Sequence, residues 1–393
     1  MTRTTTMLDQ ARELQQEIVE LRRHIHAHPE LSFAEKETAA LAAQKLEALG
    51  FQLTTGVSGT GVVADLGQGK TVAIRADMDA LPVAEANPVP YRSQNQGVMH
   101  ACGHDAHVAC ALAAARLLSS ARLPGRIRML MQPAEENVDA EGKSGAMRMV
   151  EEGAMKGVDA VIGQHIDASI PSGKVGILPG PIMAAADSFE LIILGKGGHG
   201  AYPEVTIDSV VIAAQVIQAI QQIVPRRIAA TEPAVVTVGS IHSASVRGNI
   251  ISDSVVMQGT IRCFKETVRR TLMGELERAC QVARALGADY KLEWEPGYPA
   301  TVNHPSVSEV MRAAACELIG AENVIAFPLK TWAEDFSVLA QAAPGAFMFL
   351  GGEIKGDRRS HHSPDFDIDE SGLYIGAAIL AETARRLLVE NWG

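Results

Sequence analysis

The chain has 393 residues, 47% of them hydrophobic and 21% charged, which is typical of a globular protein long enough to build more than one hydrophobic core. Lysine and arginine (35 residues) are outnumbered by aspartate and glutamate (46 residues), so the formal net charge is −11. Because no long basic run occurs either, the composition argues against a nucleic-acid partner and against docking on acidic membranes.

The cysteines and the apolar segments indicate the compartment. Five cysteines are scattered without regular spacing, which favours reduced thiols over a disulfide framework. Residues 1–13 are polar and lack the apolar core of a signal peptide, and no later stretch stays apolar for membrane-spanning length. We therefore expect a cytoplasmic protein with no membrane partner.

Residues 5–50 carry apolar side chains at helical spacing, interrupted at His28-Pro29, where proline should end a helix. The pattern predicts two helices joined by a histidine-rich turn. His24, His26 and His28 alternate along the chain, so only some of them could face a common site. Capping and core hydrogen bonds are the simplest roles for these side chains.

A main sheet is predicted by five short apolar runs that end in polar residues: 61–66, 71–76, 127–131, 160–163 and 346–350. Helical stretches lie between these runs, at 107–118 and 145–152 among others. Strands that alternate with helices predict an α/β fold with a twisted, mostly parallel sheet covered by helices.

The pattern changes near residue 187. The elements then follow in β-α-β-β-α-β order, at 189–194, 207–223, 234–241, 254–263, 268–286 and 289–295. Such a unit is complete and could fold by itself. Because strands of the main sheet precede and follow it, we interpret residues 187–297 as a domain inserted into a main domain made of 1–186 and 298–393.

Acidic and histidine side chains gather where the predicted strands of the main sheet end. They are Asp77, Asp79, Glu135, Glu136 and His165. In open α/β sheets, ligands bind outside the carboxyl ends of the strands. The coincidence predicts a functional site at this edge of the sheet.

A possible metal-binding turn precedes the helical stretch at 107–118. It places Cys102 and His104 two residues apart. A thiolate and an imidazole held this close are suitable ligands for a transition metal. Without further ligands, a buried cysteine beside a hydrogen-bonded histidine would be the better explanation of the pair.

Further donors strengthen the metal interpretation: Glu136, His165 and one of His361 or His362. Five donors exceed what one tetrahedral zinc needs and suit two adjacent ions that share a bridging group. The two carboxylates of the doublet Glu135-Glu136 can then have different roles, because neighbouring side chains at a strand end point in different directions. One carboxylate can hold metal while the other acts on the bound water as a general base.

Eight short motifs run in order along nearly the whole chain: Pro29-Glu-Leu-Ser-Phe33, Arg75-Ala-Asp-Met-Asp79, Met99-His-Ala-Cys-Gly-His-Asp105, Gln132-Pro-Ala-Glu-Glu136, Gly198-His-Gly-Ala201, Gly259-Thr-Ile-Arg262, Glu334-Asp-Phe-Ser337 and His362-Ser-Pro-Asp-Phe-Asp367. Together they resemble the M20 metallopeptidase family. The resemblance is greatest to its amidohydrolase branch, which contains hippurate hydrolases, indole-acetyl-amino acid hydrolases and aminoacylase-like carboxypeptidases.

The resemblance implies a dinuclear centre with the ligands Cys102, His104, Glu136, His165 and His362. His362 is preferred to His361 because the family's ligand stands two residues before the proline, here Pro364. Glu135 would be the acid and base, and Cys102 would bridge the ions. Mixed sulfur, nitrogen and oxygen ligation is compatible with zinc, manganese, cobalt or nickel, two ions per chain.

By the same resemblance, the inserted domain is a lid and a dimerisation unit. Three of its side chains would contact the substrate: His199, Asn249 and Arg262. His199 would stabilise the oxyanion, either within its own subunit or across a dimer, and Arg262 is chemically suited to a substrate carboxylate. We therefore expect a small-molecule substrate and a homodimer or homotetramer.

The predicted activity is metal-dependent hydrolysis of the amide bond of N-acyl amino acids or related small conjugates. Two alternatives stay open: a dipeptidase or carboxypeptidase acting on short peptides, and a non-catalytic small-molecule-binding relative. The glycine-rich run 195–200 also matches a dinucleotide-binding pattern. However, Pro203 precedes any helix there, and residues 214–223 offer no acidic side chain for a ribose.

Overall fold

A computed structural model describes residues 6–392, so the first five residues of the polar segment 1–13 lie outside the described residues. The chain forms two compact units, the first made of Met1–Gly180, Val302–Pro328 and Asp335–Gly393, the second of Pro181–Thr301 and Leu329–Glu334. The second unit thus begins before the predicted boundary at residue 187 and includes a separate short segment. Within residues 6–392, no helix is long and apolar enough to cross a membrane.

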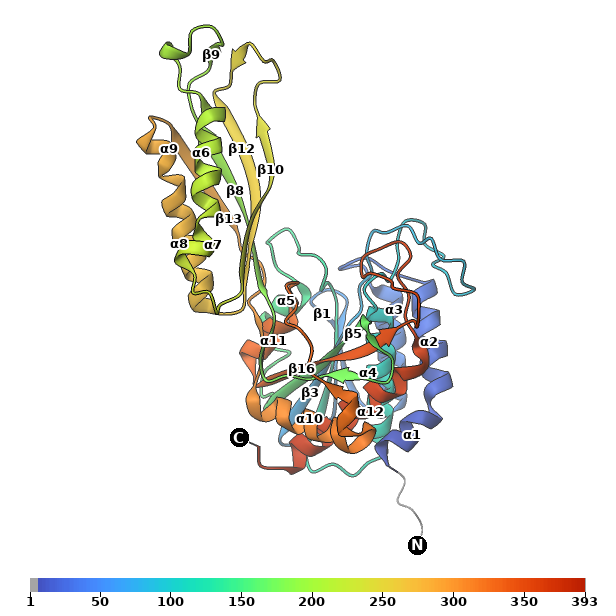
Figure 1. Cartoon of the computed structure of the whole chain (residues 1–393). Helices are drawn as coiled ribbons and strands as arrows, with labels where there is room; N and C mark the ends of the chain where they lie inside the picture. Colours follow the sequence, from blue (N-terminus) through green and yellow to red (C-terminus); the bar gives the residue numbers. More distant parts are fainter. Residues whose placement is uncertain (1–5, 393) are drawn as a thin grey trace. The chain divides into compact units, whose positions relative to one another are not determined.

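Eight strands form the main sheet of the first unit (Figure 1): β1 Gln52–Val57, β2 Gly61–Gly67, β3 Thr71–Asp77, β4 Arg126–Gln132, β5 Ala160–Pro171, β6 Val175–Gly176, β15 Val324–Ile325 and β16 Gly345–Glu353. Their order is β1-β2-β4-β3-β5-β16-β6-β15. The central pairs β3–β4, β3–β5 and β5–β16 are parallel, whereas β1–β2, β2–β4 and β6–β16 are antiparallel. The mostly parallel sheet predicted from the sequence is confirmed.

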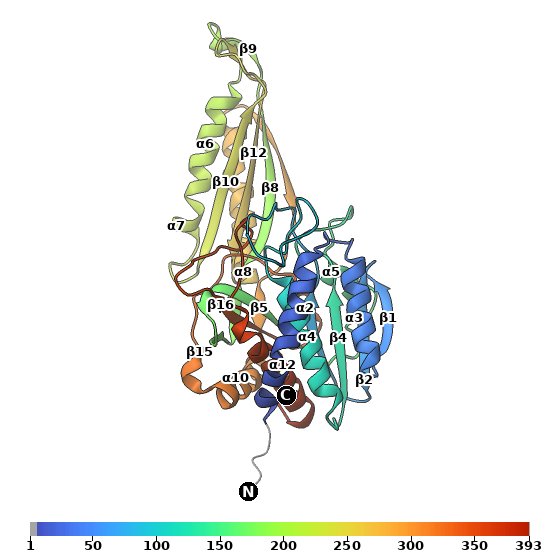
Figure 2. The same ribbon diagram turned by 90° about the vertical axis from the view of Figure 1, so that its right-hand side faces the viewer.

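Helices cover this sheet (Figure 2). Two long, buried helices, α4 (His104–Ser119) and α12 (Leu373–Val389), pack on β3 and β5. Every residue of β3 is buried, which suits the apolar residues 72–74 at its centre, whereas Arg75 and Asp77 near its end are buried as an ion pair. The other helices of 13 residues or more in this unit are α2 Gln15–Ala27, α3 Lys36–Ala48 and α10 Pro305–Ile319; the short α5 Gly145–Glu151 and α11 Phe336–Ala342 contact each other.

The N-terminal helical region differs from the prediction in one respect. The segment before Pro29 forms two helices, α1 (Met7–Glu13) and α2, which meet at Leu14. The apolar spacing runs through this break, so the pattern gave no sign of it. The predicted end near His28-Pro29 is confirmed, since α2 ends at Ala27.

The second unit is a four-stranded antiparallel sheet with helices on one face (Figure 1): β8 Ala185–Leu194, α6 Ser209–Gln221, α7 Ile223–Arg227, β10 Ala234–Ser243, β12 Ser254–Cys263, α8 Glu266–Cys280, α9 Val282–Ala285 and β13 Asp289–Glu295. The strand order is β10-β12-β8-β13. Its hydrophobic core joins Leu191 and Met257 of the sheet to Val216 and Leu272 of the helices. The predicted β-α-β-β-α-β order is confirmed, although each predicted helix is divided into two.

The glycine-rich run in the second unit does not open a helix. Gly198–His199 forms a short strand, β9, which pairs with β11 (Ile250–Ile251). A single 3-10 turn, Pro203–Val205, follows. A dinucleotide site needs a helix N-terminus immediately after the glycines, so this structure does not support that interpretation.

Candidate metal centre

The turn before α4 positions Cys102 and His104. Gly103, between them, is the N-cap of α4 and has the left-handed φ of +98°. A Cβ atom at this position would lie 2.3 Å from Ile166 Cγ2. Gly103 is therefore required for two reasons: the left-handed backbone conformation and the close approach of β5. The turn places His104 in the first turn of α4 and Cys102 just before it.

The structure brings the five predicted ligands together within the first unit. Their donor atoms form two groups, each with all atoms within 4.8 Å of one another: Cys102 with His104 and His165, and Cys102 with Glu136 and His362. Cys102 Sγ lies 3.3 Å from His165 Nε2, and His362 Nε2 lies 3.1 Å from Glu136 Oε1. Cys102 belongs to both groups, as a bridging ligand would.

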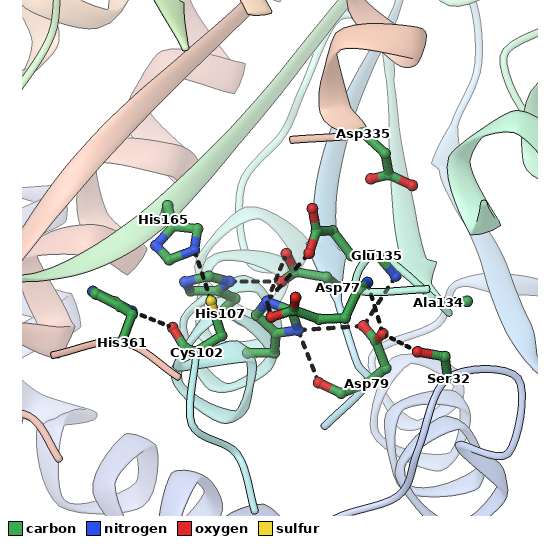
Figure 3. A network of polar contacts seen from close by, with 12 residues as sticks. Ser32, Asp77, Asp79, Cys102, His107, Ala134, Glu135, His165, Asp335 and His361 are labelled. Atoms are coloured by element: carbon green, nitrogen blue, oxygen red, sulfur yellow. Dashed lines mark hydrogen bonds and ion pairs between the residues drawn. The ribbon is translucent and has the colours of Figure 1, made fainter. Parts of the chain in front are cut away.

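The two adjacent histidines have different surroundings. The His362 side chain reaches Glu136, and its residue has the left-handed φ of 64°. The His361 ring instead lies 3.2 Å from the carbonyl oxygen of Cys102 (Figure 3). Its Nε2 atom accepts the N–H of Ala168. His361 does not belong to any of the potential metal-binding groups found among residues 6–392.

One buried atom tests whether the donor set fits a metal. His104 Nε2 makes no hydrogen bond with any described residue, and Asp77 Oδ2 lies 3.6 Å from it. The opposite ring nitrogen of His104, Nδ1, lies 2.8 Å from the carbonyl oxygen of Asp79, which leaves Nε2 as the nitrogen that faces the other donors. Buried polar atoms rarely stay without a partner, so the cluster fits a divalent cation.

The protonation of the cluster follows from burial and the nearby carboxylates. Burial alone would lower the pKa of His104, but Asp77 and Asp79 raise it to about 10. Burial and the glutamate doublet raise the pKa of the Cys102 thiol well above its ordinary value, whereas burial lowers the pKa of His165 and keeps that ring neutral. A metal bound by Cys102 and His104 must therefore displace a proton from each.

A buried ionic network supports the cluster from the end of β3. Asp77 accepts from Arg75, at 2.7 Å, and lies 2.6 Å from His107 Nδ1. His107 Nε2 in turn accepts the backbone N–H of Ile166, next to His165. Arg75 also donates to Asp335 at 2.8 Å. Arg75, His107 and Asp335 were not predicted as parts of the site; the presence of Arg75 and Asp335 within the motifs was the only signal for these two residues.

Asp79 connects the cluster to the glutamate doublet (Figure 3). Its two carboxylate oxygens accept the backbone N–H groups of Glu135, at 3.1 Å, and Glu136, at 3.0 Å. The Ser32 hydroxyl donates to the same carboxylate at 2.6 Å. Asp79 therefore holds His104 through its carbonyl and the doublet through its side chain.

The three predicted substrate contacts lie in the second unit. His199 is in β9, and its Nδ1 accepts the N–H of Ala201. Asn249 lies beside it, since its carbonyl accepts the N–H of Gly200. Arg262 is in β12, where its guanidinium donates to Thr260 Oγ1 and to the carbonyl of Ile261, at 3.0 Å.

A parallel sheet that gathers two overlapping groups of metal ligands, with a further carboxylate beside them, defines a metal-dependent hydrolase. Comparison with known proteins gives the family. Residues 73–386 match the model of peptidase family M20/M25/M40, and the chain belongs to this family, as the sequence motifs predicted.

Individual relatives agree with this assignment. The chain is 44% identical to an N-acyl-L-amino acid amidohydrolase of Geobacillus stearothermophilus, over 74% of this chain and 79% of the relative. It is 43% identical to thermostable carboxypeptidase 2 of Saccharolobus solfataricus, over 93% and 94%. The crystal structure of the YXEP protein of Bacillus subtilis, described as a dinuclear metal binding peptidase from the M20 family, has a TM-score of 0.83, with 32% identity over 96% of this chain and 99% of that one.

Proposed function

We propose that this metal-dependent hydrolase cleaves the amide bond of N-acyl amino acids, releasing a carboxylic acid and a free amino acid. One observation carries the proposal: two ligand groups share Cys102, and a further carboxylate, Glu135, lies beside them. A binding protein would not need that carboxylate. The relative named as an N-acyl-L-amino acid amidohydrolase supports the choice of substrate class.

Bound divalent metal would supply an activated water and would polarise the scissile carbonyl. Glu135 is suited to the proton transfers, because its Oε2 lies 3.9 Å from His104 Nε2, one of the ligand atoms. It takes a proton from the attacking water and delivers it to the amine as the carbon–nitrogen bond breaks. Burial of its side chain, which is 9% exposed, excludes bulk water during the transfer.

The metal complement follows from the donors. Two ions per chain would be held by the two donor groups, and Cys102 would bridge them because its sulfur belongs to both groups. Sulfur, nitrogen and carboxylate ligation accommodates zinc, manganese, cobalt and nickel. We further propose that His199, Asn249 and Arg262 contact the substrate, with Arg262 holding its carboxylate through two parallel hydrogen bonds.

Assembly through the second unit is part of the proposal, as is a cytoplasmic location. Among the exposed large apolar side chains of this unit, four lie on the segment from the end of β9 to the start of α6: Tyr202, Val205, Val210 and Val211. Apolar groups exposed together on one segment are typical of an interface. A homodimer or homotetramer would cover them, and sedimentation analysis of a Val211→Lys variant tests this, since a smaller species is expected.

The decisive experiment is a panel of N-acetyl and N-benzoyl amino acids and free-amine dipeptides, each assayed with zinc, manganese, cobalt or nickel. We expect acylated substrates to be cleaved and dipeptides to be poor substrates. A preference for dipeptides would assign peptidase activity instead, and absence of hydrolysis on the whole panel would favour a binding protein.

The role of Glu135 is tested separately. Glu135→Gln should keep the metal content but lower kcat at least about 100-fold, whereas Glu141→Gln, at an exposed position in the same loop region, should leave kcat unchanged. Near-normal turnover by Glu135→Gln contradicts its assignment as the general base.

A further inference from the structure

The residue before the glutamate doublet has an unusual backbone. Ala134 is completely buried and has a left-handed φ of 46°, a conformation that residues with a Cβ atom rarely adopt. Such conformations persist only where the surroundings impose them, and they concentrate at functional sites.

The backbone of this loop is fixed from several sides. The Ala134 N–H donates to Glu35 Oε1 at 2.8 Å, and its carbonyl accepts the N–H of Gly145 at 2.8 Å. A Cβ atom at Gly145 would lie 1.7 Å from the Pro133 carbonyl oxygen, so no side chain fits there. Since Asp79 accepts the next two N–H groups, each amide from Ala134 to Glu136 has a carboxylate partner.

Glu35 is itself held rigidly. Its side chain is fully buried, and the same Oε1 atom accepts the N–H of Phe33 at 3.0 Å. Thr60 donates to the other oxygen at 2.5 Å. Phe33 also has a left-handed φ, of 62°, so one carboxylate oxygen connects two strained positions, one on each loop.

We propose that Glu35 is a positioning residue for Glu135. Its carboxylate selects the left-handed conformation of Ala134, and this conformation sets the direction in which the Glu135 side chain leaves the loop. The role is geometric: a hydrogen-bond acceptor at a fixed place is needed, and its negative charge is not. This inference rests on the proposed role of Glu135 as general base.

Two variants separate geometry from charge. Glu35→Gln keeps an oxygen for the N–H groups of Ala134 and Phe33, and its amide can donate to the Thr60 hydroxyl, so kcat should stay within about threefold of wild type. Glu35→Asp keeps the charge but withdraws the acceptor by one methylene. Because a misplacement of about 1 Å can cost about 100-fold in rate, kcat of Glu35→Asp should fall about 10- to 100-fold, with KM within about twofold and metal content unchanged.

Glu30 provides the matched control. It lies in the same loop and also accepts two backbone N–H groups, those of Glu37 and Thr38 at the start of α3, both at 2.9 Å. Glu30→Asp should lower thermal stability to a similar degree as Glu35→Asp while kcat stays close to wild type. If Glu35→Asp does not fold, Thr60→Val replaces it, with the same expected decrease in kcat at constant KM.

Three results would overturn the positioning role: wild-type kcat in Glu35→Asp, or in Thr60→Val where it is used instead; an equal loss in Glu35→Gln and Glu35→Asp; or an equal loss in Glu30→Asp. Wild-type protein and Glu135→Gln are assayed alongside. An active wild type with an inactive Glu135→Gln shows that the proposed function stands, so that such a result would count against Glu35 alone.

Discussion

Replacing Gly103 with alanine tests whether the turn between two metal ligands tolerates any side chain. Its φ of +98° should cost an L-residue about 1–2 kcal/mol. The new Cβ would also meet Ile166 Cγ2 at 2.3 Å, and such overpacking costs about 1–3 kcal/mol. We therefore expect Gly103→Ala to lower the free energy of unfolding of the first unit by about 2–5 kcal/mol.

Two further variants separate the contributions of backbone conformation and of overpacking to this loss of unfolding free energy. Gly69 has the same φ of +98° in the first unit, with nothing within 4 Å of its Cβ position, so Gly69→Ala should cost only the backbone part, about 1–2 kcal/mol. Ile166→Ala removes the clashing methyl. In that background, the loss of unfolding free energy caused by Gly103→Ala should therefore decrease to about 1–2 kcal/mol.

The assay is urea unfolding followed by tryptophan fluorescence. Trp392 packs on the core of the first unit, whereas Trp294 and Trp332 belong to the second. A background carrying Trp294→Phe and Trp332→Phe therefore reports the first unit alone. The reasoning is refuted if Gly103→Ala costs no more than Gly69→Ala, or if its cost is unchanged by Ile166→Ala.

Three other predictions concern protons and charges. Because the pKa of the Cys102 thiol is raised well above its ordinary value, metal affinity should increase with pH from 6.5 to 8.5, as competition with a chelator would measure, and a flat profile would contradict thiolate ligation. The pKa of His26 is raised, since its hydrogen bonds to Asp105 and Glu85 overcome burial and the nearby Arg22. The stabilisation that protonated His26 contributes is thus fully present below its unfolded-state pKa and is lost as pH rises through its folded-state pKa. The replacement His26→Phe should therefore decrease the free energy of unfolding more at pH 6 than at pH 9. Asp187→Ala removes the buried partner of Arg269 and should destabilise the second unit by about 3–5 kcal/mol, measured by Trp294 fluorescence; a loss below about 1 kcal/mol would contradict this.

The sequence predicted the centre of the fold better than its edges. β3 and β16 are buried along nearly their whole length, so the apolar residues 72–74 and 346–350 stand together and are easily recognised. β1 is mostly exposed, and β6 and β15 have two residues each. β1 pairs only with the adjacent strand β2, whereas β6 and β15 pair with each other although α6, α8 and α10 lie between them along the chain, and no local pattern contains that pairing.

In the candidate site, too, some residues could be predicted from the sequence and others could not. The spacing of Cys102 and His104 alone favoured a buried cysteine and histidine, and only the further donors and the family motifs made metal binding the better prediction. The doublet Glu135-Glu136 stood out because it follows a predicted strand. The groups that hold them lie far away along the chain: Glu35 contacts a residue 99 positions later, and Arg75 contacts one 260 positions later. Hydrogen bonds over such distances leave no periodic signal in one sequence.

The position of β16 in the sheet has a consequence for biosynthesis. It pairs with β5 so that Gly163 meets Phe347, about 180 residues further along the chain. At about 5–20 residues per second, the ribosome adds this partner roughly 10–40 s after β5 is made. All four strands of the second unit's sheet are complete by residue 295. During this interval the nascent chain carries an unpaired, apolar strand edge, so chaperone binding to nascent chains should be strongest between the synthesis of β5 and of β16.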